Sequence, residues 1–563
     1  MNRTYKLGLL GLGLLGAVSA IALSATAAPE AIKLTGTRVD NFMLADQTGM
    51  GHELYYFKDK AAVVIVTAAQ GDAVSERAKA ALLKIQDSFK DKNVHFVMLD
   101  SGLNSKHGTF EGVPGSAKLP VLADELQLVG RSLGVTQTGE AFVINPKTWT
   151  VAYHGPIDSS FADKKVANAD LTTALNAVIA GQSPLVAEAP VKGTKIVFPD
   201  RAKAAGFKNI SYATQVAPVL ADKCVVCHTE GGMGPFSMNK YEVVKAMAPM
   251  IREALRTKRM PPYHSDDHGS TWTDDMRPTN EQVKTIINWI EAGAPRGTGR
   301  DALKEDASEA PEWPASLGKP DVIIDLPAFD VPASGLVEYQ NMRVDNPFKQ
   351  DAWLRAISIK PGDRSVLHHV VSNHMADPKL PKSKIPGGSV GSYTPGAEAQ
   401  VIATGAGAPV PAGGKLNFQM HYTTTGKATT DHTQVGFYTL KTAPEFIKRS
   451  TVIGDFGLKI PAGAARHEEI SYQTFPADAY IYTLYPHSHY RGYSVELKAV
   501  TPDGKETMLL SLPKYDFNWQ RDYDPETPIL VKKGTKLVAK WIYDNSANNR
   551  ANPDSTRDIT WGE

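Results

Sequence analysis

The chain has 563 residues, too many for one hydrophobic core, so we expect three or four domains. Its formal net charge of +1 provides no basic field that would attract nucleic acid, so no nucleic-acid partner is expected. A charged fraction of 21% and a hydrophobic fraction of 42% are those of an ordinary globular protein.

Residues 1–28 have the pattern of a signal peptide. Arg3 and Lys6 precede an apolar run from Leu9 to Leu23, and Ala25-Thr26-Ala27 offers the small residues of a cleavage site. An uncleaved anchor is the alternative, but the run is short for a span and no basic stop-transfer segment follows it. We expect export to a periplasm or the cell exterior, with no membrane span after cleavage.

Residues 32–182 alternate strand and helix patterns, which predicts an α/β domain. The expected strands are 62–66, 95–99 and 141–144, and the expected helices are 75–89 and 126–133. The order resembles a thioredoxin or peroxiredoxin-type fold, most closely from Leu133 to Pro146.

The reactive residues of that family have no counterpart here. The nucleophilic cysteine would follow the first buried strand, where this chain reads Thr67-Ala68-Ala69-Gln70-Gly71. The cis-proline would precede the later strand, where it reads Thr138-Gly139-Glu140. Without a thiol there is no thiol–disulfide exchange, so we expect this domain to serve packing or partner binding.

The only two cysteines lie in Cys224-Val225-Val226-Cys227-His228, the attachment motif of a c-type haem. Two thioethers would anchor the vinyl groups and place His228 beneath the iron. A zinc site would need two further ligands at matching spacing, and a redox disulfide is the other alternative. Residues 205–298 are therefore expected to form a small all-α cytochrome c-like domain with one covalent haem, between linkers at 183–204 and 299–320.

The sixth iron ligand is expected downstream of this motif. Met260 precedes Pro261 and Pro262, which resembles the Met-Pro motif of many monohaem cytochromes. His264 is the rival ligand. A helix is expected further on, with a capping box from Thr279 to Gln282 and a stop near Gly293.

From residue 321 onward the pattern is that of short strands between turns rich in glycine and proline. It predicts two antiparallel, jelly-roll-like sandwiches, at 321–445 and 446–563. The overall fold class is thus multidomain: a thioredoxin-like domain, an all-α domain and two all-β domains.

Five histidines stand in three clusters within this β half: His368, His369, His421, His487 and His489. Imidazole ligands without thiolate suit copper, zinc or iron, and copper binds such sites most tightly. Adjacent strand residues point to opposite faces, so His368 and His369 can share an ion only at a bulge or strand end. His487 and His489 are two apart and would project from one face of a strand.

The order and wording of these clusters resemble the copper type II, ascorbate-dependent monooxygenases, the family of peptidylglycine and dopamine hydroxylases, over about residues 320–563. The resemblance implies a first copper at His368, His369 and His421 that relays electrons. It implies a second, catalytic copper at His487 and His489, where dioxygen is activated for C–H hydroxylation. We hypothesise that the haem feeds electrons to the first copper, because both would sit on one chain.

The family's second copper also takes a methionine from a segment after a late strand, and the sequence ends about where that segment would begin. We therefore expect one tight and one weaker copper site, the latter completed by water or a residue such as Met508. A non-catalytic copper-binding or electron-transfer protein is the alternative function, and a scaffold with degenerate modules is a third. The expected partners are dioxygen, an external electron donor to the haem, and a small-molecule or peptide substrate that the sequence does not identify.

Overall fold

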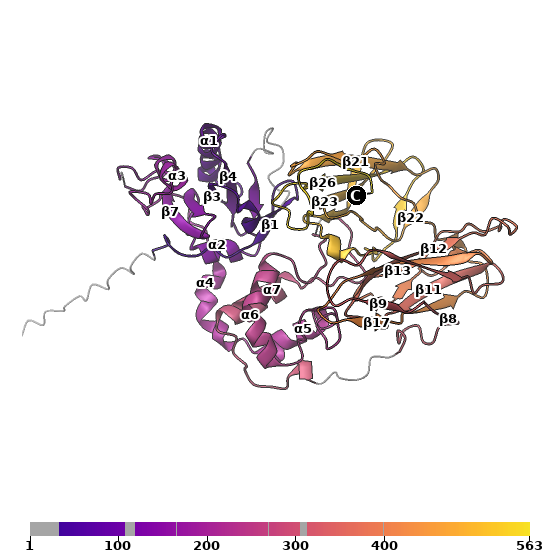
Figure 1. Cartoon of the computed structure of the whole chain (residues 1–563). Coiled ribbons are helices and arrows are strands. Elements are labelled where there is room, and N and C mark those ends of the chain that lie inside the picture. The colour runs from indigo at the N-terminus through magenta and orange to yellow at the C-terminus, as the bar shows by residue number, and fades with distance from the viewer. Residues whose placement is uncertain are drawn as a thin grey trace, which may run out of the picture.

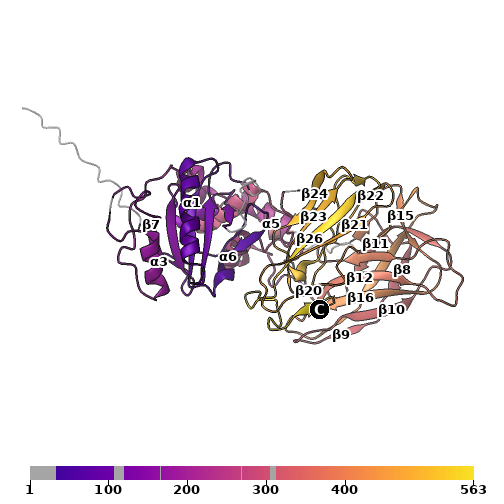
Figure 2. The same cartoon turned by 90° about the horizontal axis from the view of Figure 1, so that it is seen from above.

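The computed structural model describes residues 33–106, 119–164, 166–267, 269–304, 312–397 and 399–562. The expected signal peptide lies outside these residues. In the part of the chain that is described, no helix is long and apolar enough to cross a membrane. Figure 1 shows an α/β region, a group of helices and two β regions, and Figure 2 shows the α/β region at one end of the molecule and the β regions at the other.

The N-terminal region has thioredoxin-like topology. Its five-stranded sheet has the order β5-β4-β3-β6-β7, in which β3, β4 and β5 are parallel and β6 and β7 are antiparallel to their neighbours. The strands are β3 (Ala62–Ala68), β4 (Val94–Asp100), β5 (Val121–Ala123), β6 (Glu140–Asn145) and β7 (Thr150–Pro156). The helices are α1 (Ala73–Ser88), α2 (Leu128–Leu133) and α3 (Leu171–Ile179), and a small hairpin joins β1 (Met43–Ala45) to β2 (Gly51–Glu53), followed by the 3₁₀ turn η1 (Leu54–Phe57).

All the strands and helices expected in this region are present. Every residue of β3 is buried, because alternate side chains enter two different cores. Val64 and Val66 pack with α1 and α3, whereas Val63 and Ile65 pack with α2.

The segment expected as a first linker, 183–204, is only partly a linker. Ile196 and Phe198 are buried in the core that contains α2, and the Thr138 N–H donates to the Thr194 carbonyl at 2.8 Å. The proline- and alanine-rich composition of the segment concealed these apolar residues, which bind it to the sheet domain.

The regular elements described between residues 199 and 304 are all helical. They are α4 (Pro199–Lys203), η3 (Ala204–Asn209), η4 (Tyr212–Val216), α5 (Ala217–Lys223), α6 (Tyr241–Arg256), α7 (Asn280–Glu291) and η5 (Ala302–Lys304). Helix α7 begins with the expected capping box between Thr279 and Gln282, and Gly293 follows it with a φ of 90°. Tyr212 and Trp289 are fully buried where these helices meet.

This helical group is not evident as a separate domain. After α6, the chain leaves the helices and runs along the edge of β24 (Glu506–Leu512) in the C-terminal β region. The N–H groups of Asp266 and Ser270 donate to the carbonyls of Ser511 and Leu509, each at 3.1 Å. Tyr263 and Trp272 belong to the core of that β region. Part of the 205–298 segment therefore lies in the core of a sandwich that is far away in sequence.

The first β region is a two-sheet sandwich. One sheet has the order β10-β16-β12-β13 and the other β19-β15-β11-β18-β8, with β14 also paired to β11. The strands are β8 (Val322–Asp325), β9 (Phe329–Val331), β10 (Gln340–Asp345), β11 (Ala352–Lys360), β12 (Leu367–Met375), β13 (Ser389–Tyr393), β14 (Ala399–Val401), β15 (Ala406–Val410), β16 (Lys415–Tyr422), β17 (Thr429–Asp431), β18 (Gln434–Thr439) and β19 (Phe446–Ile447). The strand pairs described in this sandwich are antiparallel except β15 with β19, and β19 extends this sandwich beyond residue 445.

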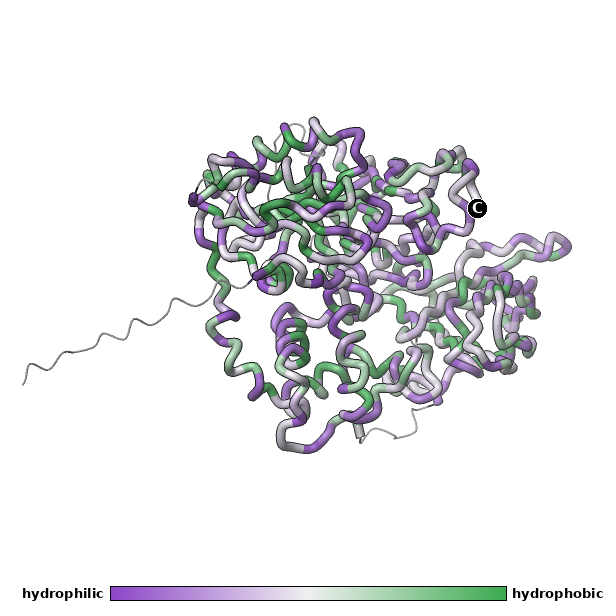
Figure 3. The backbone as a smooth tube through the Cα atoms, turned by 60° about the vertical axis from the view of Figure 1, so that its left-hand side comes forward, coloured by the Kyte–Doolittle hydropathy of each residue, from purple (hydrophilic) through white to green (hydrophobic). Residues whose placement is uncertain are grey.

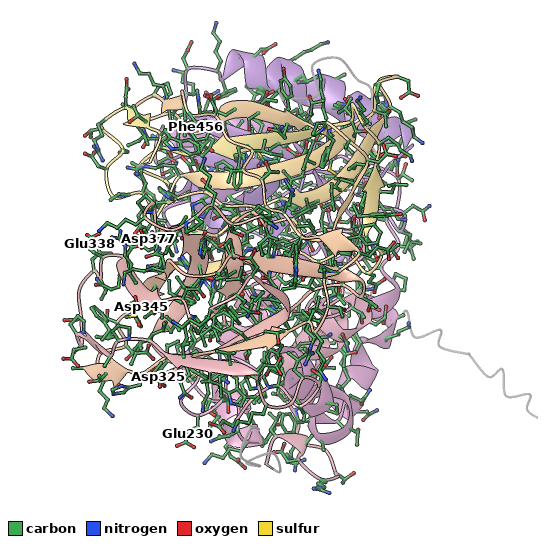
Figure 4. The ribbon with its side chains drawn as sticks, turned by 90° about the vertical axis from the view of Figure 1, so that its right-hand side faces the viewer. Glu230, Asp325, Glu338, Asp345, Asp377 and Phe456 are labelled. Carbon is green, nitrogen blue, oxygen red and sulfur yellow. The ribbon has the colours of Figure 1, made fainter. Side chains whose placement is uncertain are left out.

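The second β region contains a four-stranded antiparallel sheet of order β21-β26-β23-β24 and two short ribbons, β22-β25 and β20-β27. Its other strands are β20 (Lys459–Ile460), β21 (His467–Thr474), β22 (Ala479–Ile481), β23 (Gly492–Val500), β25 (Ile529–Val531), β26 (Lys536–Tyr543) and β27 (Ile559–Thr560). Figure 3 shows hydrophobic segments mostly inside the molecule and hydrophilic segments mostly toward its outside, and Figure 4 labels the exposed carboxylates Asp325 and Asp345.

The thioredoxin-like region contacts both the helices and the C-terminal sandwich. Arg252 on α6 donates to Asp40 at 2.6 Å, and Arg131 donates to Glu291 on α7 at 2.8 Å. On the other side, Lys514 pairs with Glu53 next to the β1–β2 hairpin. This region therefore joins the helices to the C-terminal sandwich.

Candidate metal and haem sites

A β-bulge brings the first two histidines to the same side of the sheet. Strands β12 and β16 pair Leu367 with Tyr422 and then His369 with His421, so the register skips His368. An extra residue at this point cancels the alternation that would otherwise separate neighbouring side chains. The bulge that a shared ion would require at His368 and His369 is thus present, and it places His421 beside them.

The three rings present the same nitrogen to one another. The Nδ1 atoms of His368 and His369 are 3.2 Å apart, and those of His421 and His369 are 3.3 Å apart. One ligand atom from each of the three residues lies within 4.8 Å of the others. Two nitrogens bound about 2.0 Å from one ion at a tetrahedral angle would be about 3.3 Å apart, so the spacing fits a shared ion.

Burial keeps this cluster free of protons. Burial lowers the pKa of His368 to about 4, and burial together with the neighbouring imidazoles lowers the pKa of His369 to about 2. Burial also lowers the pKa of His421. Metal binding requires neutral imidazole, so these rings are in the ligand form at neutral pH without help from a metal.

The second pair, His487 and His489, lies in a loop between β22 and β23, not on the strand expected from its spacing. The rings are nevertheless adjacent, with centroids 5.3 Å apart and planes at 89°. The Tyr515 hydroxyl shapes the loop: it accepts from the Ser488 N–H at 3.0 Å and donates to the Ser488 carbonyl at 2.8 Å. The prediction that the two rings lie side by side was thus correct, whereas the prediction that they stand on a strand was wrong.

The two histidine groups face each other across a 3₁₀ turn of the C-terminal sandwich, η6 (Phe517–Trp519). The Phe517 ring centroid lies 5.9 Å from that of His421 and 6.3 Å from that of His489. Trp519 lies 5.8 Å from His368, ring to ring. His487 is close enough to His369 for its charge to contribute to the lowered pKa of that ring.

The haem motif lies at the end of α5. His228 is buried, and its Nδ1 lies 2.9 Å from the Phe236 carbonyl, which fixes the ring and leaves Nε2 for a ligand. A Cβ at Gly234 would lie only 2.6 Å from that Nδ1, so glycine lets the imidazole pack here. Cys224 and Cys227 are half-buried free thiols. These features fit covalent haem held by Cys224, Cys227 and His228.

The raised pKa values of the two cysteines argue against a redox disulfide at this motif. Burial raises the pKa of Cys224 to about 12 and also raises the pKa of Cys227. Thiol–disulfide exchange proceeds through thiolate, which such pKa values disfavour at neutral pH.

Met260 and His264, the two candidates for the sixth ligand of the haem iron, differ in their surroundings. Met260 is half-buried just after α6, and its N–H lies 3.4 Å from the Ala254 carbonyl. His264 faces the C-terminal sandwich, where its N–H lies 3.4 Å from the Tyr523 hydroxyl, and burial lowers its pKa to about 4. The assignment of Met260 stays a prediction.

The haem motif lies beside the first sandwich, and residues downstream of it contact the C-terminal sandwich. A Cβ at Gly396, between β13 and β14, would lie 3.7 Å from the Met276 sulfur and 3.9 Å from the Cys227 sulfur. Arg521 of the C-terminal sandwich lies 3.5 Å from the same Met276 sulfur and stacks 4.6 Å above the Tyr263 ring.

Sequence reasoning missed the residues that surround these groups. They are Tyr339, Met276 and the segment from Phe517 to Arg521. A single sequence carries no signal for them, because they come from loops whose neighbours are set by tertiary packing.

No family model matches the chain, and no curated protein matches it. Similar solved structures cover only its N-terminal part and are thioredoxin- or peroxiredoxin-like. A hypothetical protein from Sinorhizobium meliloti 1021 is 26% identical over 30% of this chain and 94% of its own, with a TM-score of 0.26. A peroxidoxin from Mycobacterium tuberculosis is 20% identical over 26% of this chain and 94% of its own, with a TM-score of 0.20. The fold assignment rests on the topology described above.

Proposed function

We propose that this chain is an exported, copper- and haem-containing oxidoreductase of the monooxygenase type. The observation that carries the proposal is the bulged cluster of His368, His369 and His421, which faces His487 and His489 across one turn. Its donor set contains only imidazole nitrogens, which copper binds most tightly among the common divalent metals.

Copper, when bound, would supply one-electron redox chemistry and a site where dioxygen reacts, and haem c would supply a one-electron carrier. The chain's own residues provide rigid positions for these groups. The β12–β16 ladder holds the first three ligands, while Phe517 of the η6 turn lies against a ring of each histidine group. Cys224, Cys227 and His228 would hold the haem where the helices meet both sandwiches.

The proximity of the haem motif to Arg521 of the C-terminal sandwich supports electron delivery within one chain. Arg521 lies beside Met276, and its charge acts on Cys227, while Trp519, two residues earlier, lies against His368. The donor side and the copper side thus share a short segment. The thioredoxin-like region would stabilise this arrangement through its contacts with the helices and the C-terminal sandwich.

The test begins with the purified, full-length protein. A pyridine haemochrome assay on denatured protein should retain the pigment, and loss of colour on acid-acetone extraction would contradict covalent haem. Copper analysis should find metal that is lost in His369→Ala. Ascorbate-driven oxygen uptake that requires this copper, together with a hydroxylated product, would distinguish an oxygenase from the alternative, a copper-binding electron-transfer protein.

A further inference from the structure

The Gln520 side chain is buried and directed at the second histidine pair. It is 1% exposed, at the end of the η6 turn. Its Oε1 accepts a hydrogen bond from His487 Nδ1, and its Nε2 donates to the Phe517 carbonyl at 3.1 Å. The Tyr485 hydroxyl lies 3.5 Å from the same Oε1. Since the amide nitrogen is engaged with a carbonyl, the oxygen is the atom presented to His487.

An acceptor at Nδ1 selects one form of the ring. His487 must carry its proton on Nδ1 to donate to Gln520, which leaves the Nε2 lone pair available. In the first cluster the Nδ1 atoms converge on one another, so these rings would bind an ion through Nδ1 and not through Nε2. The two histidine groups thus present different ring nitrogens to their ions, and the partner of each ring decides which one.

The same turn also holds a ligand of the first cluster. The backbone of Asn518, inside η6, lies close enough to His368 to raise the pKa of that ring, and Trp519 lies against the ring. Asp516 caps the turn, because its carboxylate accepts from the Asn518 N–H at 2.9 Å. A shift of this turn would therefore move the partners of His368 and His487 together.

We propose that Gln520 is a positioning residue that orients His487 for metal binding through Nε2 and, through the η6 turn, couples the second histidine site to the first. This inference rests on the proposed copper sites. Partners that hydrogen-bond to a ligating histidine are commonly worth about 10–100-fold in metal affinity.

Copper(II) titration of the full-length chain against a competing chelator tests the inference. Gln520→Leu removes the acceptor and should weaken the second site about 10–100-fold. Gln520→Glu keeps an acceptor oxygen for His487 but loses the donation to the Phe517 carbonyl, so it should bind copper at the second site more tightly than Gln520→Leu does. The matched control is Gln473→Leu, which replaces an exposed glutamine on β21 of the same sandwich. It should leave the copper affinity of both sites unchanged. The electron paramagnetic resonance signal of the first site should shift in Gln520→Leu and remain unchanged in Gln473→Leu.

Two outcomes separate the inference from the proposed function. If His487→Ala loses the second site while Gln520→Leu binds copper like the wild type, the role of Gln520 is wrong and the copper site stands. If His487→Ala binds copper like the wild type, the second copper site is wrong and the role of Gln520 falls with it.

Should Gln520→Leu fail to fold, nitrogen-15 NMR of labelled histidines in the metal-free wild type gives an independent answer. His487 should carry its proton on Nδ1, and a proton on Nε2 would overturn the inference.

Discussion

The two histidine groups are built in different ways. The first cluster stands on two paired strands, where the ladder between β12 and β16 and one bulge fix all three rings. The second pair stands in a loop, whose shape depends on the Tyr515 hydroxyl and whose His487 ring depends on Gln520. A ladder positions ligands through many backbone bonds, whereas a loop relies on a few side chains. The first site should therefore tolerate changes around it that the second does not.

The largest expected effect is the loss of a ligand from the rigid site. His369→Ala should lower copper affinity at the first site by more than about 100-fold, because His369 contacts both other ligands. Loss of a residue that only supports a ligand costs about 10–100-fold. His374→Ala is the control on the same strand, since its Nε2 lies against the Gly413 carbonyl instead. Chelator-competition titration measures both. Equal affinity in His369→Ala and His374→Ala would contradict the assignment.

The difference between the rigid first site and the loop-built second site can be tested by removing one tyrosine hydroxyl beside each. Tyr515→Phe leaves the Ser488 N–H and carbonyl without their partner, which should cost about 1–3 kcal/mol in unfolding free energy and weaken the second site. Tyr422→Phe removes the bond to Asp431 beside the first cluster and should destabilise the fold without changing first-site affinity. Urea unfolding and copper titration of both variants give the answer. A loss of first-site affinity in Tyr422→Phe as large as the second-site loss in Tyr515→Phe would refute the distinction.

Acid should act on the first cluster through its lowered pKa values. In the unfolded chain histidine titrates near its usual value of 6.5, whereas folded His368 titrates at about 4. The unfolded state therefore binds more protons between these values, and the metal-free protein should lose stability as the pH falls from 6.5 to about 4. Because the folded rings stay neutral, copper should remain bound below pH 6, where an ordinary histidine site weakens. Urea midpoints and copper retention measured from pH 7 to 4 test this, and copper release with a midpoint near 6.5 would contradict it.

The smallest expected effect concerns the contact between the two sandwiches. Ser392 donates to Asp522 at 2.8 Å, and Gln400 donates to the same carboxylate oxygen at 3.2 Å. Ser392→Ala should cost about 1 kcal/mol or less, because Gln400 still satisfies the acceptor. Differential scanning calorimetry measures the change. A drop in second-site copper affinity in this variant would mean that sandwich contact, beyond Gln520, positions the second pair.

Local sequence determined the identity of the elements and of the candidate ligand residues. Hydrophobic periodicity was sufficient for β3, α1 and β4 in the thioredoxin-like region, and for the capping box of α7. The need for a bulge at His368 followed from the two-residue repeat of a strand, because adjacent side chains otherwise point apart. The cysteine motif and the histidine clusters were recognisable because ligand type and spacing are themselves sequence properties.

Tertiary structure alone decided which residues support these ligands. Gln520 and His487 are 33 residues apart, and Asn518 and His368 belong to different sandwiches. The helical segment likewise places Trp272 in the core of the C-terminal sandwich, a sharing that no local pattern records. Such contacts form because loops are placed by the packing of the sheets that carry them, and their own residues have no periodic signal. The sequence therefore identifies the candidate ligands, and the packing of the domains determines how they are oriented.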